Sequence, residues 1–194
     1  MKRTFLVFFI AVLVLFGRVG ALAQEPEHFK FMGISMGLNE KAFVKELKKK
    51  GFKSQKNSDG NVYITGMFRN REAMVSYTIT PVSKRPWIAS ISMSMPDWYD
   101  IKQCYYTLKG DFFSKYGEPD VVQEDIPTKY IGMELEYLSD KDNNFQTIWQ
   151  LNNGAISLKI SSYYFYGDYK GHLIIQYIDS ANRLQEANER ISDL

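Results

Sequence analysis

Two stretches with helical periodicity, each followed by segments in which apolar and polar residues alternate, limit this chain to a small set of folds. A helix places its apolar residues three and four positions apart, whereas a strand places every second residue on one face. The alternating segments follow one another with short turns, which is typical of antiparallel strands. The sequence therefore predicts an α+β fold with helices packed on one face of an antiparallel sheet.

The first helix is predicted to begin after Asn39, a favourable N-cap, and to end at Gly51, a residue suited to a left-handed C-terminal position. A short apolar strand at 31–37 precedes it. An Asp59-Gly60 turn then leads into the first of three predicted strands, at 61–68, 73–80 and 87–95.

The second helix is predicted to begin after Asp97 and to end at Gly117. Its apolar face is Ile101, Cys104, Tyr105, Leu108, Phe112 and Tyr116. Further strands are predicted at 121–126, 133–139, 145–151, 155–163 and 172–179. The tail, 180–194, is predicted to be a charged helix with Ala181, Leu184, Ala187 and Ile191 on one side.

Because a helix followed by strands occurs twice, the sequence predicts two related αβββ units. The first covers 31–96, and the second covers 97–194 with the C-terminal helix. Both units are expected to share one sheet and to form one compact domain.

Residues 1–23 have the pattern of a secretory signal peptide, with basic residues before the apolar run Phe5–Phe16 and a small-x-small motif ending at Ala23. The apolar run is shorter than the ~20 residues of a membrane-spanning helix. A lipoprotein would need a cysteine where Gln24 stands. The sequence thus predicts cleavage after Ala23, a short tether at 24–30, and a periplasmic or secreted chain without a transmembrane or lipid anchor.

The charge balance of the chain depends on this leader. The full chain has 24 Lys and Arg residues against 22 Asp and Glu residues. Lys2, Arg3 and Arg18 lie in the leader, so the mature chain keeps 21 of the 24 basic residues and a net charge near −1. This balance gives no reason to predict nucleic acid as a partner.

Several segments resemble the beta-lactamase-inhibitor-like fold. They are the stretch from Phe31 through Gly37 to Leu47, the helix end Lys115-Tyr116-Gly117-Glu118-Pro119 after Leu108, and the strands with Gly154–Leu158 and Tyr177–Asp179. In that fold an extended apolar segment and a glycine lead into a short helix and an antiparallel sheet, and the unit is often duplicated. Uncharacterised exported proteins of Gram-negative bacteria are similar. The inhibitor's enzyme-contacting residues and disulfides have no counterpart here, so the resemblance implies a fold and not beta-lactamase inhibition.

No catalytic, metal or cofactor set can be assembled from the sequence. His28 lies in the tether and His172 begins a strand, and neither belongs to a motif with an acid or a nucleophile, so both are predicted to be surface residues. Cys104 is predicted to be a buried thiol. The run 140–144 is rich in oxygen ligands but lacks the Gly and Glu that complete a calcium loop. The chain is therefore predicted not to be an enzyme.

Two segments are candidates for binding. Tyr164, Phe165, Tyr166 and Tyr169 surround a turn, and tyrosine is a favoured anchor of binding surfaces. The alternative is that these rings pack in the core or cover a neighbouring strand. Seven lysines lie within residues 41–56; of these Lys45, Lys48, Lys49 and Lys50 are candidates for contact with anionic lipid or lipopolysaccharide. The alternative is an ordinary solvated helix face.

The sequence leaves three functional hypotheses. The first is a non-enzymatic binding or inhibitor-like module that engages a protein or an envelope component. The second is a structural or assembly accessory of the cell envelope, and the third is a small hydrolase. An exposed aromatic patch favours the first hypothesis, a lysine face opposite an apolar groove favours the second, and a buried acid beside His172 favours the third.

Overall fold

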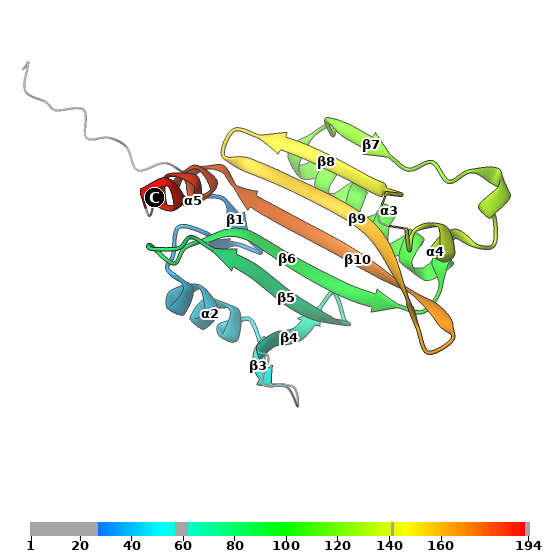
Figure 1. Ribbon diagram of the computed structural model, residues 1–194, viewed down its shortest axis with the longest axis horizontal. Helices are drawn as coiled ribbons and strands as arrows, with labels where there is room; N and C mark the ends of the chain where they lie inside the picture. The colour runs from blue at the N-terminus through cyan, green and yellow to red at the C-terminus, as the bar shows by residue number, and fades with distance from the viewer. Residues whose placement is uncertain (1–26, 57–61, 141, 193–194) are drawn as a thin grey trace, which may run out of the picture.

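The computed structural model describes residues 27–56, 62–140 and 142–192, which form an eight-stranded antiparallel sheet covered by helices on one face (Figure 1). The predicted leader at 1–23 and the predicted turn at 57–60 lie outside these ranges. The strand order is β3-β4-β5-β6-β10-β9-β8-β7. The predicted α+β class is confirmed.

The bounds of the elements are as follows. The strands are β1 (Lys30–Phe31), β2 (Ile34–Ser35), β3 (Lys53–Lys56), β4 (Val62–Phe68), β5 (Arg71–Ile79), β6 (Pro86–Met95), β7 (Val121–Gln123), β8 (Phe145–Leu151), β9 (Gly154–Phe165) and β10 (Asp168–Asp179). The helices are α2 (Glu40–Lys49), α3 (Trp98–Tyr116), α4 (Glu134–Tyr137) and α5 (Ser180–Ser192), with a 3-10 turn η1 (Thr128–Tyr130). None of these described helices is both long and apolar enough to cross a bilayer.

Each half of the chain runs through a helix and then four strands, α2 with β3 to β6 and α3 with β7 to β10. The final strands of the two halves, β6 and β10, pair at the centre of the sheet. The αβββ pattern predicts three strands in each half. In the second half five segments were predicted as strands, and four of them are strands in the structure. In the first half the missed strand is β3, whose residues Lys53–Lys56 are polar and exposed, so it carries no alternating pattern.

The strand register places the apolar side chains of the sheet on one face. One row across the middle consists of Val75, Ile91, Ile175, Leu158 and Thr147, all buried. Helices α3 and α5 pack against β6, β9 and β10, and Phe43 and Leu47 of α2 belong to the same core. This single buried face is what the period-two alternation predicts.

Local signals at the helix ends are confirmed. The side chain of Asn39 caps α2 by accepting a hydrogen bond from a backbone amide of the first turn at 3.0 Å. At the other end Gly51 has a φ of +90°, and the amide of Phe52 donates to the carbonyl of Leu47 at 3.2 Å. This is the Schellman ending that a glycine at this position favours. Asp97 caps α3 in the same way as Asn39, at 2.8 Å.

Two strand predictions were wrong. Residues 133–139, predicted as a strand, contain α4, because Leu135 and Leu138, three positions apart, both contact the core. Residues 31–37, predicted as one strand, contain the two strands β1 and β2 joined by Met32-Gly33. Both turn residues have positive φ, as a tight two-residue hairpin requires.

The end of the predicted tether belongs to the fold. Phe29 is only 6% exposed, and its amide donates to the carboxylate of Asp179 at 2.6 Å. The same carboxylate caps α5 by accepting from the amide of Asn182 at 2.7 Å. His28 lies 3.3 Å from it through Nδ1, so the prediction of a surface histidine at this position was wrong. A buried carboxylate thus ties the start of the described chain to α5.

Candidate partner-binding surface

The face of the sheet opposite the helices is open and largely polar. One row of side chains crosses all eight strands on this face: Lys53, Thr65, Met74, Ser92, Ile174, Lys159, Gln146 and Gln123. On the central strand β6, the open face carries Ser92 and Ser94 in alternation with buried apolar residues, while Ser90 on the same side is buried. Because serine is short, another surface can approach the middle of this face closely.

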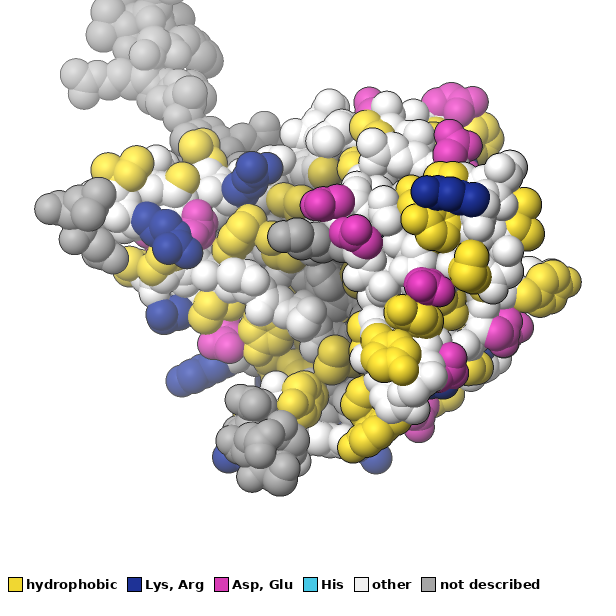
Figure 2. Space-filling model, turned by 45° about the vertical axis from the view of Figure 1, so that its right-hand side comes forward, with side chains coloured by type: hydrophobic (Ala, Val, Ile, Leu, Met, Phe, Trp, Pro, Cys, Tyr) yellow, Lys and Arg dark blue, Asp and Glu magenta, His cyan; other side chains and the backbone are white. Residues whose placement is uncertain are grey.

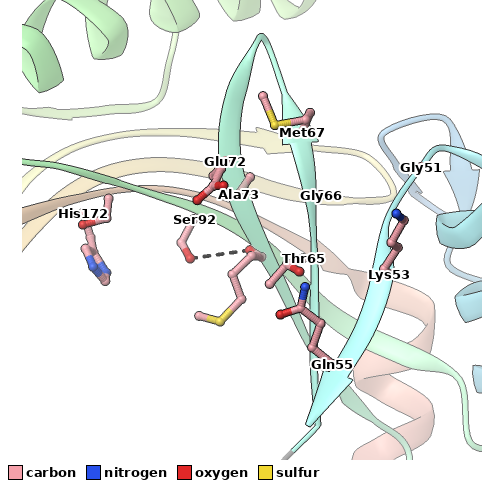
Figure 3. Close-up of a pocket in the computed structure, with 12 residues that line it drawn as sticks. Gly51, Lys53, Gln55, Thr65, Gly66, Met67, Glu72, Ala73, Ser92 and His172 are labelled. Carbon is pink, nitrogen blue, oxygen red and sulfur yellow. Dashed lines mark hydrogen bonds between the residues drawn. The ribbon is translucent and has the colours of Figure 1, made fainter. Parts of the chain in front are cut away.

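A hollow of about 520 Å³ lies on one side of the open face. Figure 3 shows its lining residues arriving from five strands, with Lys53 and Gln55 on β3, Thr65 and Met67 on β4, Glu72 on β5, Ser92 on β6 and His172 on β10. Ser92 is fixed by a long hydrogen bond from its hydroxyl to the carbonyl of Met74 at 3.5 Å. The lining therefore offers hydroxyl, amide, ammonium and carboxylate groups beside two methionines.

His172 connects this hollow to the hairpin between β9 and β10. Its ring packs edge-on against the ring of Tyr163, with 4.7 Å between the centroids. The residue is half-buried, and burial lowers the pKa of its imidazole below the ordinary value. His172 therefore favours the neutral form at neutral pH. It was predicted as a surface residue, and it lies on the open face of the sheet with about half of its surface covered.

The β9–β10 hairpin extends beyond the rest of the sheet, as Figure 1 shows at the end of the two longest strands. Strand β6 pairs with β10 only as far as Gly171, and β8 pairs with β9 only as far as Ile160. Residues 163–170 pair only with one another. We call these residues the aromatic tip.

The aromatic tip exposes most of its rings. Tyr164 is 63% exposed, Phe165 51% and Tyr166 93%, while Tyr169 is half-buried and packs on Tyr164 at 5.1 Å between centroids. Tyr163, 39% exposed, lies on the open face beside His172. Packing in the core, one part of the alternative prediction, is therefore wrong for Tyr164, Phe165 and Tyr166. The other part, coverage of a neighbouring strand, holds for Tyr164 and Tyr169, which pack across the hairpin.

The turn at the aromatic tip carries a residue that its geometry does not favour. Tyr166 and Gly167 occupy the two central positions with φ of +47° and +88°. Such a two-residue hairpin turn needs positive φ at both positions and is dominated by Asn, Asp and Gly. A left-handed conformation costs an ordinary side chain roughly 1–2 kcal/mol. The most exposed ring of the tip therefore occupies a strained position, a feature that clusters at functional sites.

The predicted lysine cluster is solvent-exposed. Three of its members, Lys45, Lys48 and Lys49, are exposed on α2, and the fourth, Lys50, is the exposed residue that caps its C-terminus. Lys49 forms an ion pair with Glu46 at 2.6 Å, within the same helix. Their exposure is compatible with both hypotheses, anionic contact and a solvated face, so contact with anionic lipid stays a prediction.

The most connected titratable group beneath α3 is Glu124, whose oxygen Oε1 accepts hydrogen bonds from three donors. Lys109 lies at 2.5 Å, Thr147 at 2.7 Å and the buried Tyr105 at 2.9 Å. Burial opposes ionisation of Glu124, but the three donors and the Lys109 charge outweigh it and lower its pKa. Burial, aided by the nearby Glu124 charge, raises the pKa of Tyr105 far above the ordinary value. This cluster joins the end of β7 to α3 and β8 and leaves the side chain of Glu124 only 15% exposed.

The single cysteine is less buried than predicted. Cys104 lies on α3, packs against the edge of the core and is half-buried. Burial raises the pKa of its thiol, while Arg71 and Arg69 partly oppose that shift. Both arginines reach α3 from the β4–β5 hairpin through ion pairs with Asp100 and Asp111.

Among the described residues, no three His, Cys, Asp or Glu side chains come close enough together to hold a metal ion. Comparison of the chain with protein-family models, with curated proteins and with solved structures finds no match. The resemblance to the beta-lactamase-inhibitor-like fold therefore stays a prediction, and the candidate site rests on its geometry.

Proposed function

We propose that this chain is a binding module of the cell envelope that holds a protein partner with the aromatic tip and the adjoining open face of the sheet. The observation that carries the proposal is Tyr166, a 93% exposed ring in a left-handed turn position. Tyrosine offers a large contact area and loses little rotamer entropy when it is buried by a partner.

The surface around the aromatic tip supports the same proposal. Tyr163 and His172 connect the rings to a hollow whose lining includes Ser92 and Ser94. Apolar anchors beside polar groups are typical of protein interfaces, in which an aromatic centre is surrounded by a polar rim. The partner chemistry that fits is a protein surface with a pocket for one or two rings and polar groups facing the serines.

We also propose export, on the pattern of residues 1–23. The mature chain would begin at Gln24, and intact-mass measurement of the protein recovered from its source would test this. Recovery of a chain that retains residues 1–23 would contradict it.

The binding proposal is tested by affinity capture from the source envelope fraction. The bait is the chain from Gln24, compared with a tip variant carrying Tyr164→Ser, Phe165→Ser and Tyr166→Ser. A matched control removes exposed rings from α3 by Tyr99→Ser and Phe113→Ser, which are 69% and 47% exposed. We expect a protein retained by the wild type and the control and lost by the tip variant. Equal capture by all three would contradict the proposal.

A further inference from the structure

Helix α5 turns its apolar stripe away from the protein. Leu184, Ala187 and Ile191 recur at helical spacing, and Leu184 and Ile191 are 66% and 67% exposed. A surface helix usually buries its apolar stripe and exposes its polar side. Here the buried residue is Asn182, fully enclosed, whose amide group donates to the carbonyls of Met36 and Pro86 at 2.8 Å each.

The loop between β5 and β6 extends this exposed stripe. Val82, 65% exposed, is held beside α5 because its amide donates to the carboxylate of Glu189 at 2.7 Å. The start of α2 is held to the same loop by a hydrogen bond from the amide of Glu40 to the carbonyl of Lys84 at 2.7 Å. Three segments therefore form one end of the molecule.

This end carries more basic than acidic side chains. We define the basic end as Lys41, Val82, Lys84, Arg183, Leu184 and Ile191, all exposed. Within the described residues, Lys41, Lys84 and Arg183 form no ion pair. Figure 2 shows Lys and Arg side chains gathered where α2 and α5 lie, whereas Asp and Glu side chains dominate the opposite part of the view.

Each of the nearby acids has a hydrogen-bond or ion-pair partner within the protein. Glu40 accepts from the hydroxyl of Tyr77 at 3.1 Å, and Glu186 pairs with Arg190. The carboxylate of Glu189 accepts from the β5–β6 loop. These hydrogen bonds leave the carboxylates ionised. The basic end is positive only in balance, because the four bases Lys41, Lys84, Arg183 and Arg190 outnumber the three acids Glu40, Glu186 and Glu189.

The described chain also begins at the basic end, since His28 contacts Asp179, the residue before α5. The preceding 26 residues include the apolar run Phe5–Phe16, which is predicted to enter the membrane during export. The described chain therefore begins at the end of the fold that exposes these apolar and basic side chains.

We infer that the basic end docks on the surface of an anionic lipid bilayer. Leu184, Ile191 and Val82 enter the headgroup region, and the basic side chains contact lipid phosphates, as amphipathic helices with flanking cations do. Strand β10 joins α5 to the aromatic tip and has 12 residues, so the two ends are separated by roughly 36 Å. Docking at the basic end therefore leaves the aromatic tip directed away from the membrane, free for the proposed partner.

Vesicle flotation with the chain from Gln24 tests this inference. Binding to vesicles of phosphatidylcholine is compared with binding to vesicles in which phosphatidylglycerol replaces part of the phosphatidylcholine. We expect binding only to the anionic vesicles, and its loss at high salt. A charge variant with Lys41→Gln, Lys84→Gln and Arg183→Gln should bind up to about 100-fold more weakly.

Two further variants complete the test. The apolar variant Leu184→Ser with Ile191→Ser should also bind the anionic vesicles more weakly. The control, with Lys102→Gln, Lys115→Gln and Lys129→Gln on exposed positions outside the basic end, should bind like the wild type.

Three results would overturn the inference: equal binding to neutral and anionic vesicles, equal losses in the control and the charge variant, or no vesicle binding. In the last case, a dimer in solution that the apolar variant dissociates would identify a second copy of the chain as the occupant. The charge variant should still capture the protein partner, so failure of this inference is distinguishable from failure of the proposed function.

Discussion

Replacing Tyr166 with asparagine should make the protein more stable and its partner binding weaker. Tyr166 has a φ of +47° at the first central position of a two-residue turn and is 93% exposed. Asparagine adopts this conformation far more readily than tyrosine. The substitution therefore relieves strain in the free protein and removes the most exposed ring of the aromatic tip.

Three contributions set the change in the free energy of unfolding that Tyr166→Asn should cause. Relief of the left-handed conformation contributes about 1–2 kcal/mol. The ring of Tyr166 contacts that of Phe165 at 4.4 Å between centroids, and losing this pair costs about 0.5 kcal/mol at an exposed site. Little apolar surface is lost from the folded state because the side chain is almost fully exposed. The net gain is about 0.5–1.5 kcal/mol, or a rise of about 1–6 °C in Tm for a chain of this size.

Urea unfolding followed by circular dichroism measures the stability, and titration with the captured partner measures the affinity. Tyr164→Asn is the contrasting variant, since it also removes an exposed ring but relieves no turn strain. It breaks the cross-strand contact with Tyr169 and should lower stability by about 0.2–1 kcal/mol. Both variants should bind the partner more weakly. A Tyr166→Asn variant that is less stable than wild type, or that binds as tightly, would refute this reasoning.

Other predictions concern the core. Asp179→Ala should lower the free energy of unfolding by about 2–4 kcal/mol, because it removes the cap of α5 and leaves the buried amide of Phe29 without its acceptor. Asp97→Ala removes one exposed cap and should lower it by about 1 kcal/mol. Equal losses of the two variants in urea unfolding would contradict this. Folding lowers the pKa of Glu124, so its contribution to stability is complete above its ordinary value of 4.5 and is lost as the pH falls through the lower folded-state value. Glu124→Gln should therefore flatten the acid side of the stability profile, and an unchanged profile would oppose this assignment. Burial raises the pKa of the Cys104 thiol, so a thiol reagent at pH 8 should modify it much more slowly in the native protein than in denaturant; equal rates would indicate a freely accessible thiolate.

Much of the fold could be predicted because its signals are local. The alternation in β5, β6, β8 and β9 identifies strands with one buried face, and the caps Asn39 and Asp97 with Gly51 and Gly117 identify the helix ends. Each of these residues acts within a few positions of itself, so one sequence is enough to interpret it.

The errors arise where distant contacts decide the local structure. Residues 133–139 form a helix because Leu135 packs near Gly171, where a Cβ atom would approach Leu135 Cδ2 to 3.1 Å. Strand β7 ends at Gln123 instead of residue 126, since Glu124 turns toward Tyr105. No periodicity within these segments contains that information.

The rings of the candidate site could be predicted from the sequence, but the residues that lie beside them in the fold could not. The density of rings at 163–169 indicated the aromatic tip from the sequence. The contact of Tyr163 with His172 joins two strands whose predicted bounds stopped at 163 and began at 172, so no local pattern placed these two side chains together. The spacing of the apolar residues of α5 could be read from the sequence. Which side of the helix faces the protein depends on the hydrogen bonds from Asn182 to the distant carbonyls of Met36 and Pro86.

Photocrosslinking gives the most direct test that the aromatic tip contacts a protein partner. A benzoylphenylalanine incorporated at position 166, and separately at position 99 on α3, reports which protein lies against each side chain in the source envelope. The proposal predicts a specific crosslinked protein from position 166 and none from position 99. A crosslink from position 99 alone, with position 166 unreacted, would show that the binding surface lies on the helices and would contradict the proposal.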